Sequence, residues 1–162
     1  MTLTGACWQG RSDRLFNCER PRKGIGQRER YLLCSTLGSN GAFRHQAGIE
    51  QIVDVRSRFT VVDLGCEVDT AAGAFMDTAA IVQHLDLVIT SDSALPHLTG
   101  ALGIPTWLAT PKVADWRWGD EGETTPWYQN MRIFRQRRWN DWKDVFQRLA
   151  GAIRDGSGPV CS

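Results

Sequence analysis

The stretch LDLVITSDSALPHLTGALGIPTWLATP, residues 85–111, decides the fold. Its apolar run over residues 87–90 is rich in β-branched side chains, which predicts a buried strand. Ser91, Asp92 and Ser93 follow, and these residue types favour the N-terminal cap of a helix. Pro96 is compatible with a first helical turn, because a backbone N–H there has no intrahelical acceptor to lose. The chain is therefore expected to pass from a strand directly into a helix.

The predicted helix repeats apolar residues at three- and four-residue spacing, which indicates one face turned to the core. The members of this face are Ala94, Leu95, Leu98, Ala101 and Leu102. Gly103 ends the helix, Pro105 prevents its restart, and residues 104–109 predict the next strand. Strand, helix and strand in this order indicate a parallel βαβ crossover. Its polar turn lies at the carboxyl end of a strand and at a helix N-terminus, where open α/β sheets bind ligands and free amides favour phosphate.

Length and composition indicate one soluble globular domain. The chain has 162 residues, of which 42% are hydrophobic and 23% charged. Its net charge is +1, divided as +5 over residues 1–60 and −4 over residues 61–162. The basic amino-terminal part has neither stacked aromatics nor a repeated basic motif, so we interpret it as a solvated surface and expect no nucleic-acid partner. The alternative, a nucleic-acid binder led by residues 11–30, predicts steeply salt-dependent binding.

Cysteine usage and hydropathy indicate a cytoplasmic chain without a structural metal. The five cysteines are widely spaced, with no Cys-x-x-Cys pair and no histidine at zinc-like spacing. We expect reduced thiols and no metal site. No apolar run approaches the roughly 18 residues of a membrane span, and the amino terminus lacks the pattern of a signal sequence.

The chain divides into three parts by pattern. Residues 1–60 are the least regular and are expected to hold the first βα units: a short strand over 2–8, a loop over 14–30, a strand over 31–34 and a weak helix over 46–59. Residues 61–155 carry the strongest periodicity and form the expected core. Residues 156–162 are a tail.

Within the core the patterns continue to alternate between strand and helix. Residues 59–64 predict a strand, and a helix capped by Asp77 or Thr78 is expected to run to about Leu85. Its core side chains are predicted to be Ala80, Ile81 and Leu85. Residues 131–134 predict a last strand, and residues 139–153 an amphipathic helix. Its apolar face is predicted to comprise Trp142, Val145, Phe146, Leu149 and Ile153. The predicted fold class is α/β, a single Rossmann-like domain with a parallel sheet.

Two polar groups near the opening stretch have both a functional and a purely structural interpretation. Ser93 and the first helical amides are suited to a diphosphate, and Asp92 to a sugar or ribose hydroxyl, but a helix cap without ligand explains the same residues. His97 lies one turn into the helix and is suited to bind a phosphate or to give it a proton. A histidine satisfied by neighbouring backbone is the alternative. His45 and His84 are expected at the surface.

The aromatic segment after residue 111 offers a second group. In Asp115-Trp116-Arg117-Trp118, the Arg117 guanidinium is suited to neutralise charge on a diphosphate, and a flanking indole to stack on a base or sugar. A packed aromatic loop with a cation–π contact is the alternative. Further hydroxyl donors in the same segment are Thr124, Thr125 and Tyr128. A run of arginines, Arg135, Arg137 and Arg138, is interpreted as a solvated surface.

Several blocks from residue 61 to 154 occur together in one order. They are Asp77–Ala80, Leu85–Ala94, His97–Leu98, Gly100–Gly103, Pro105, Asp115–Trp118, Pro126–Tyr128 and Met131–Gln136. In this the segment resembles the carboxyl-terminal domain of bacterial glycosyltransferases of the B-type double-Rossmann architecture, in particular of the heptosyltransferase-like enzymes that follow tetratricopeptide repeats. Residues 7–10 also resemble the first strand and glycine turn of that domain.

The resemblance implies that this chain is the half of a sugar transferase that binds a nucleoside-diphosphate sugar. The implied donor and diphosphate contacts are Ser91, Asp92, Ser93, Ala94, His97 and Arg117. The residues implied to stack on the base or sugar are Trp116, Trp118 and Tyr128. His97 is the candidate catalytic residue.

The resemblance also implies a partner. An acceptor-binding domain or a repeat-containing chain is expected to supply the acceptor site and the catalytic base. No cofactor or metal is expected, because enzymes of this architecture use helix dipoles and basic side chains. The alternative is a catalytically inactive α/β remnant, or a binding module that works only with a partner chain.

Overall fold

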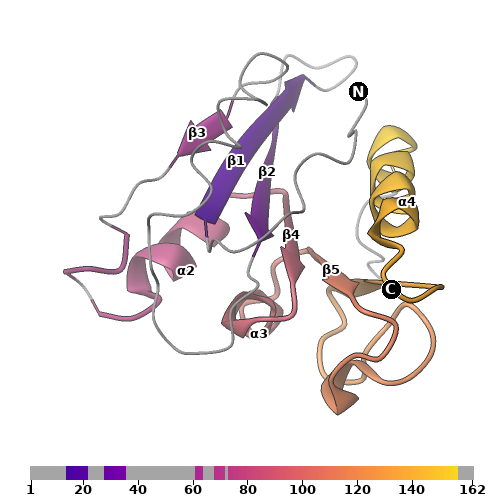
Figure 1. The fold of residues 1–162 in the computed structure, drawn as a ribbon. Coiled ribbons are helices and arrows are strands. Elements are labelled where there is room, and N and C mark those ends of the chain that lie inside the picture. The colour runs from indigo at the N-terminus through magenta and orange to yellow at the C-terminus, as the bar shows by residue number, and fades with distance from the viewer. Residues whose placement is uncertain (1–13, 22–27, 36–60, 64–67, 72, 157–162) are drawn as a thin grey trace.

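A computed structural model describes residues 14–21, 28–35, 61–63, 68–71 and 73–156. Over these residues the protein forms an open six-stranded sheet in the order β3-β1-β2-β4-β5-β6 (Figure 1). The strands are β1 (Arg14–Pro21), β2 (Arg28–Ser35), β3 (Val61–Asp63), β4 (Leu87–Ser91), β5 (Thr106–Thr110) and β6 (Met131–Arg135). The helices are α2 (Met76–Val82), α3 (Ala94–Ala101), α4 (Trp142–Arg154) and the short 3₁₀ helix η1 (Trp116–Trp118).

The strands that carry the core are parallel. β4 pairs in parallel with β2 on one side and with β5 on the other, and β5 pairs in parallel with β6. β1 is antiparallel to β2, and β3 is antiparallel to β1. Every residue of β4 and β5 is buried, as expected for central strands covered on both faces. The predicted α/β fold with a Rossmann-like parallel sheet is therefore confirmed.

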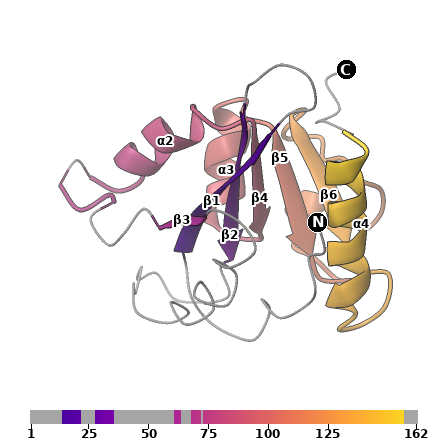
Figure 2. The same ribbon diagram turned by 90° about the horizontal axis from the view of Figure 1, so that it is seen from above.

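Helices cover the two faces of the sheet, so that the sheet is the middle of three layers (Figure 2). On one face α4 packs through Val145 and Leu149 against Ile89, Trp107 and Phe134. On the opposite face, α2 and α3 pack against β4 through a second hydrophobic cluster. Its members are Val82, Leu85, Val88, Leu95 and the half-buried Leu98. Beside them the segment that follows β5 covers Leu108 and Ile133 with Trp118. This alternation along each strand follows from the two-residue period of strand side chains.

The amino-terminal part differs from its predicted organisation. The expected loop over residues 14–30 is wrong, because β1 occupies Arg14–Pro21 and β2 already begins at Arg28. The two strands pair from Arg14 opposite Ser35 to Pro21 opposite Arg28. Such cross-strand pairing satisfies the backbone whatever the side chains, so a charged segment without apolar periodicity still forms a strand. The strand predicted over 31–34 is confirmed within β2, whereas the elements predicted over 2–8 and 46–59 lie outside the described residues.

The predicted strand over 59–64 corresponds to β3, while the next helix, α2, begins earlier than predicted. Its N-cap is Phe75, in the left-handed region at φ 64°, and neither Asp77 nor Thr78 caps it. Asp69 caps the helix instead, because its carboxylate accepts hydrogen bonds from the backbone N–H groups of Asp77 (2.8 Å) and Thr78 (3.1 Å). Asp77 in turn accepts from the backbone N–H of Asp69 at 2.8 Å. A side chain distant in sequence therefore supplies the acceptors that the first helical turn lacks.

The inward face of α2 is also shifted. Leu85 is buried as predicted, but it lies beyond the end of the helix at Val82, and Ile81 is only half-buried. Ala80 is exposed, so its predicted place in the core is wrong. The helix turns Thr78 and Val82 inward, because the four-residue spacing of these two side chains matches one face of a short helix.

The predicted course of α3 is confirmed, and so is part of its predicted apolar face, since Leu95 is buried and Leu98 packs half-buried beside it. Ser93 is the N-cap, with its Oγ accepting from the Leu95 N–H at 3.3 Å, and Gly103 follows the helix at φ 71°. Ala94, Ala101 and Leu102 are exposed, which contradicts the predicted face. The buried residues are Leu95, Pro96, Thr99 and Gly100. The helix therefore packs through Leu95 together with Thr99 and Gly100, two residues that a search for hydrophobic types does not select.

Hydrogen bonds make this stripe compatible with burial. The Thr99 hydroxyl donates to the Leu95 carbonyl (3.1 Å) and accepts from the Thr106 hydroxyl (2.8 Å), which ties α3 to the start of β5. The Asn130 side-chain amide donates to the carbonyls of Thr99 and Ile104. A buried hydroxyl costs free energy when it has no hydrogen-bond partner, and these hydroxyls have partners.

The last helix agrees closely with the prediction. The apolar face of Trp142, Val145, Phe146, Leu149 and Ile153 packs on the sheet. Asp141 caps α4 by accepting from the Asp144 N–H at 3.2 Å, and the helix begins at Trp142, not at Trp139. Trp139 is exposed outside it. β6 likewise occupies the predicted residues and extends by one to Arg135.

We predict that Asp69→Ala lowers the free energy of unfolding by about 1 to 2 kcal/mol, because the first turn of α2 loses its acceptors. Urea denaturation followed by circular dichroism measures the change. Asp120→Ala, which removes an exposed carboxylate from the loop after η1, is the control and should leave the midpoint unchanged. Equal midpoints for the two variants would contradict the capping role of Asp69.

Two glycines in helices should respond in opposite directions to alanine. A Cβ on Gly100 would lie 2.5 Å from the Tyr128 ring, whereas a Cβ on Gly151 in α4 meets nothing within 4 Å. We predict that Gly100→Ala lowers the free energy of unfolding by about 1–3 kcal/mol through overpacking. Gly151→Ala should raise it by about 0.5–1 kcal/mol through helix propensity. Urea denaturation tests both, and stabilisation by Gly100→Ala would refute the close contact.

Candidate functional site

The carboxyl edge of the parallel sheet carries the candidate site. Ser91 is the last residue of β4 and is buried, Asp92 is exposed, and Ser93 is a half-buried N-cap. Ala94 is the first residue of α3 and is exposed. The polar turn predicted from the sequence thus connects the end of a parallel strand to a helix N-terminus, where partial positive charge from the amides accumulates.

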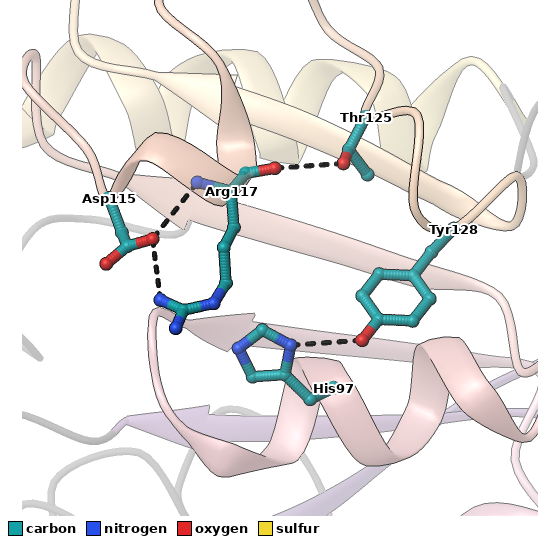
Figure 3. A network of polar contacts seen from close by, with 5 residues as sticks. All are labelled: His97, Asp115, Arg117, Thr125 and Tyr128. Atoms are coloured by element: carbon teal, nitrogen blue, oxygen red, sulfur yellow. Dashed lines mark hydrogen bonds and ion pairs between the residues drawn. The ribbon is translucent and has the colours of Figure 1, made fainter.

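His97 lies in the first turn of α3 and contacts the segment that follows β5. Its ring stacks on the buried indole of Trp118, with ring centroids 4.9 Å apart and an interplanar angle of 25°. Its Nδ1 is 3.1 Å from the Tyr128 hydroxyl, and the Tyr128 ring meets the imidazole edge-on (Figure 3). The alternative of a histidine bonded to neighbouring backbone is thus replaced by a side-chain partner 31 residues away.

Arg117 is held from three sides at the same edge. Its guanidinium forms an ion pair with Asp115, with Nη1 and Oδ1 2.8 Å apart, and lies over the Trp116 ring at 4.8 Å from the centroid. Its backbone carbonyl accepts from the Thr125 hydroxyl at 3.1 Å (Figure 3). About half of the Arg117 side chain is exposed, so the guanidinium keeps donors available to an anion.

Hydrogen bonding lowers the pKa of Asp115 below its ordinary value. The largest cause is the backbone N–H of Arg117, which donates to the carboxylate at 3.0 Å. Partial desolvation opposes it, while the Arg117 guanidinium and the positive charge of His97 lower the pKa further. Asp115 is therefore ionised at neutral pH and holds the short helix η1 and its arginine in place.

The three tryptophans of this segment have different surroundings. Trp116 is 68% exposed and meets Trp127, which is 59% exposed, edge-to-face at 6.1 Å. Trp118 is fully buried, packs on Leu108 and Ile133, and already stacks on His97. Trp116 therefore remains available for stacking on a ligand, while Trp118 supports His97 from within the core. The exposed Trp127 is not among the stacking residues predicted from the sequence, although it stands next to Tyr128, which is.

One position predicted at the surface, Arg135, proves different. Arg135 does not belong to a solvated run: its Nη2 donates to the Trp118 carbonyl at 2.9 Å, and its Nε and Nη1 are buried without a partner among the described residues. Arg137 and Arg138 are exposed as predicted.

The remaining polar candidates differ in exposure. Thr125 is buried and its hydroxyl donates to the Arg117 carbonyl, while Thr124 is exposed. His84 is exposed as predicted, and His45 lies outside the described residues.

Together these residues can bind an anion that also carries a ring. Donors come from the α3 amides, His97 and Arg117, an acceptor from Asp92, and a stacking surface from Trp116. Within the described ranges, no group of three or more His, Cys, Asp or Glu side chains is placed to hold a metal ion. In the same part of the chain, no helix combines the length and the apolar character needed to cross a membrane.

We predict that the Asp115 carboxyl titrates below the ordinary aspartate range of about 3.9. Since its native pKa is below its unfolded pKa, its contribution to stability is present above the unfolded value and is lost as the pH falls through the native value. Carboxyl-carbon NMR titration measures it. Arg117→Ala should raise the midpoint only in part, because the backbone N–H of residue 117 still donates. A wild-type midpoint at or above the ordinary value would contradict the hydrogen-bonded geometry.

Comparison with known proteins relates part of the chain to a glycosyltransferase family. Residues 72–151 match glycosyltransferase family 9 (heptosyltransferase). The chain is also 33% identical over 94 residues to protein FlbA of Caulobacter vibrioides, an alignment that covers 58% of this chain and 14% of that protein. The chain thus spans only a small part of the length of that relative, and no solved structure matches it. Residues 72–151 are therefore similar to a glycosyltransferase family 9 domain.

Proposed function

We propose that this chain binds a nucleoside-diphosphate sugar at the carboxyl ends of β4 and β5 and acts as the donor-binding part of a B-type glycosyltransferase. The observation that carries the proposal is the convergence of the α3 N-terminus, His97 and Arg117 at one edge of the parallel sheet. The family match of residues 72–151 supports the reaction class.

The diphosphate is expected at the start of α3. Ser93 and the first free amides of the helix donate to phosphate oxygens, and the helix dipole favours the negative charge. Arg117, held by Asp115, supplies a full positive charge that can form two parallel hydrogen bonds with a phosphate. Ser91 and Ala94 border this cradle through their backbone.

In the proposed reaction these donors are needed most when the bond between the sugar and the nucleotide breaks. When the sugar leaves the nucleoside diphosphate for an acceptor, negative charge grows on the oxygen of the departing phosphate. Donors that already point at this oxygen stabilise the transition state more than the ground state. His97 is the candidate to donate to it. In this proposal Arg117, His97 and the helix amides stabilise the charge, and no metal or cofactor is expected, as the resemblance to B-type transferases implies.

Two further contacts would set the ligand's orientation. Asp92 is exposed beside the cradle and accepts from a ribose or sugar hydroxyl in the proposed complex. Trp116 offers an exposed indole on which a base or sugar ring can stack. Tyr128 and Trp118, proposed as stacking residues from the sequence, instead contact His97, so we assign the stacking to Trp116.

The acceptor site and the catalytic base are expected from another segment or chain, of the acceptor-binding or tetratricopeptide-repeat type. The described sheet accounts for one Rossmann-like unit, and B-type transferases form the active site between two. The activity of the whole enzyme, its sugar and its acceptor thus depend on that second part.

Calorimetric titration of the purified chain with UDP, ADP and GDP tests the binding proposal. We expect at least one nucleotide to bind at a single site. Asp92→Ala and Ser93→Ala should each weaken binding by about tenfold or more, the loss expected for a hydrogen bond that involves a charged group.

A matched control separates these contacts from general charge effects. Asp155 is exposed at the C-terminal end of α4, at the opposite edge of the sheet, so Asp155→Ala should bind with wild-type affinity. Absence of binding for all three nucleotides would refute the proposed function. Equal losses in Asp92→Ala and Asp155→Ala would refute the assigned site.

A further inference from the structure

The imidazole of His97 is fixed in orientation before any ligand arrives. Trp118 is fully buried and covers one face of the ring, with centroids 4.9 Å apart. At the edge of the ring, Nδ1 forms a hydrogen bond with the Tyr128 hydroxyl, 3.1 Å away. Tyr128 is itself held against α3, since only the absence of a side chain at Gly100 makes room for its ring. The position of the ring therefore depends on residues in the segment after β5.

The hydrogen bond to Tyr128 also determines which ring nitrogen carries the proton. In a neutral imidazole one nitrogen donates and the other accepts, and the partner of one nitrogen selects the tautomer. A phenol O–H, with a pKa near 10, is a good donor, and a neutral imidazole nitrogen is a good acceptor. The arrangement in which Tyr128 donates to Nδ1 is therefore favoured over the reverse, and the proton of His97 stays on Nε2.

We infer that Tyr128 is a positioning residue that holds neutral His97 in the Nε2–H tautomer, so that this nitrogen acts as a hydrogen-bond donor to an anionic group at the α3 N-terminus. Figure 3 shows Nε2 on the side of the ring away from Tyr128, toward the loop that carries Asp115 and Arg117. Only the identity of the anion rests on the proposed function, where it is the phosphate of the leaving nucleotide.

The surroundings of Nε2 are consistent with a donor. Arg117 belongs to the same short helix as Trp118, which stacks on the imidazole, and its guanidinium is engaged by Asp115 at 2.8 Å. An anion that enters this corner would meet the Nε2–H and the remaining guanidinium donors together, whereas the other tautomer would present a lone pair and repel it.

The tautomer can be measured without any ligand. Long-range proton–nitrogen NMR of histidine-labelled chain at about pH 8.5, above the ordinary histidine pKa of about 6.5, distinguishes a protonated from an unprotonated ring nitrogen. His97→Gln identifies the resonances of His97 among the three histidines of the chain. We expect an unprotonated Nδ1 and a protonated Nε2 in the wild-type chain.

Tyr128→Phe is the decisive variant, because it removes the hydroxyl and keeps the ring that packs on Gly100. We expect its His97 resonances to move toward those of a histidine without this hydrogen bond, with a larger share of the Nδ1–H tautomer than in the wild-type chain. Tyr31→Phe, which removes the hydroxyl of the chain's other tyrosine, is the matched control and should leave them unchanged. A wild-type chain with the proton on Nδ1, or a tautomer ratio that Tyr128→Phe does not alter, would overturn the inference.

A binding experiment then separates this inference from the proposed function. In Tyr128→Phe the apparent dissociation constant for the nucleotide that binds wild type should rise in proportion to the fraction of molecules that lose the donor tautomer, and further as the ring loses orientation. Unchanged affinity despite an altered tautomer would overturn the donor role of Nε2. Failure of every nucleotide to bind would refute the proposed function and leave the tautomer result as an independent test of Tyr128.

Discussion

The contact between α3 and the segment after β5 is the constraint on which the candidate site depends. It is possible because residue 100 has no side chain, which lets the Tyr128 ring lie directly against the helix. That ring and the buried Trp118 then determine where His97 points. The same segment carries Asp115 and Arg117 to the carboxyl edge of the sheet. Two stretches separated in sequence thus become one surface through a single close approach.

The charges at this edge are organised in advance. Arg117 is restrained by a carboxylate, an indole and a backbone contact, and α3 presents its amides beside it. Groups that are already oriented need little reorganisation when charge develops on a ligand, and this is the physical basis of electrostatic catalysis. Residues 72–151 are similar to glycosyltransferase family 9, and in the proposed function the transfer of a sugar from a nucleotide releases an anion at this arrangement.

Much of the fold and part of the site could be predicted from the sequence where local signals are strong. β4, the Ser93 cap, α3 and the apolar face of α4 follow from strand composition, capping residues and helical spacing. Non-local contacts could not be predicted. Asp69 caps α2 from outside the helix, and Arg135 turns inward to the Trp118 carbonyl, although each looks like a surface residue in the sequence. For the same reason Trp118 and Tyr128 appeared as ligand contacts, when their partner is His97.

The order of the strands has a consequence for how the protein assembles. From β4 to β6 the sheet grows in the order of the chain, with Val88 beside Thr106 and Thr106 beside Met131. Each of these pairings is parallel, so a crossover connection must close before its two strands can form hydrogen bonds, and the loop entropy lost at that step slows the formation of parallel sheets. We therefore expect the pairing of β4, β5 and β6 to limit the rate at which this part of the chain folds, with the docking of α4 completing the second face.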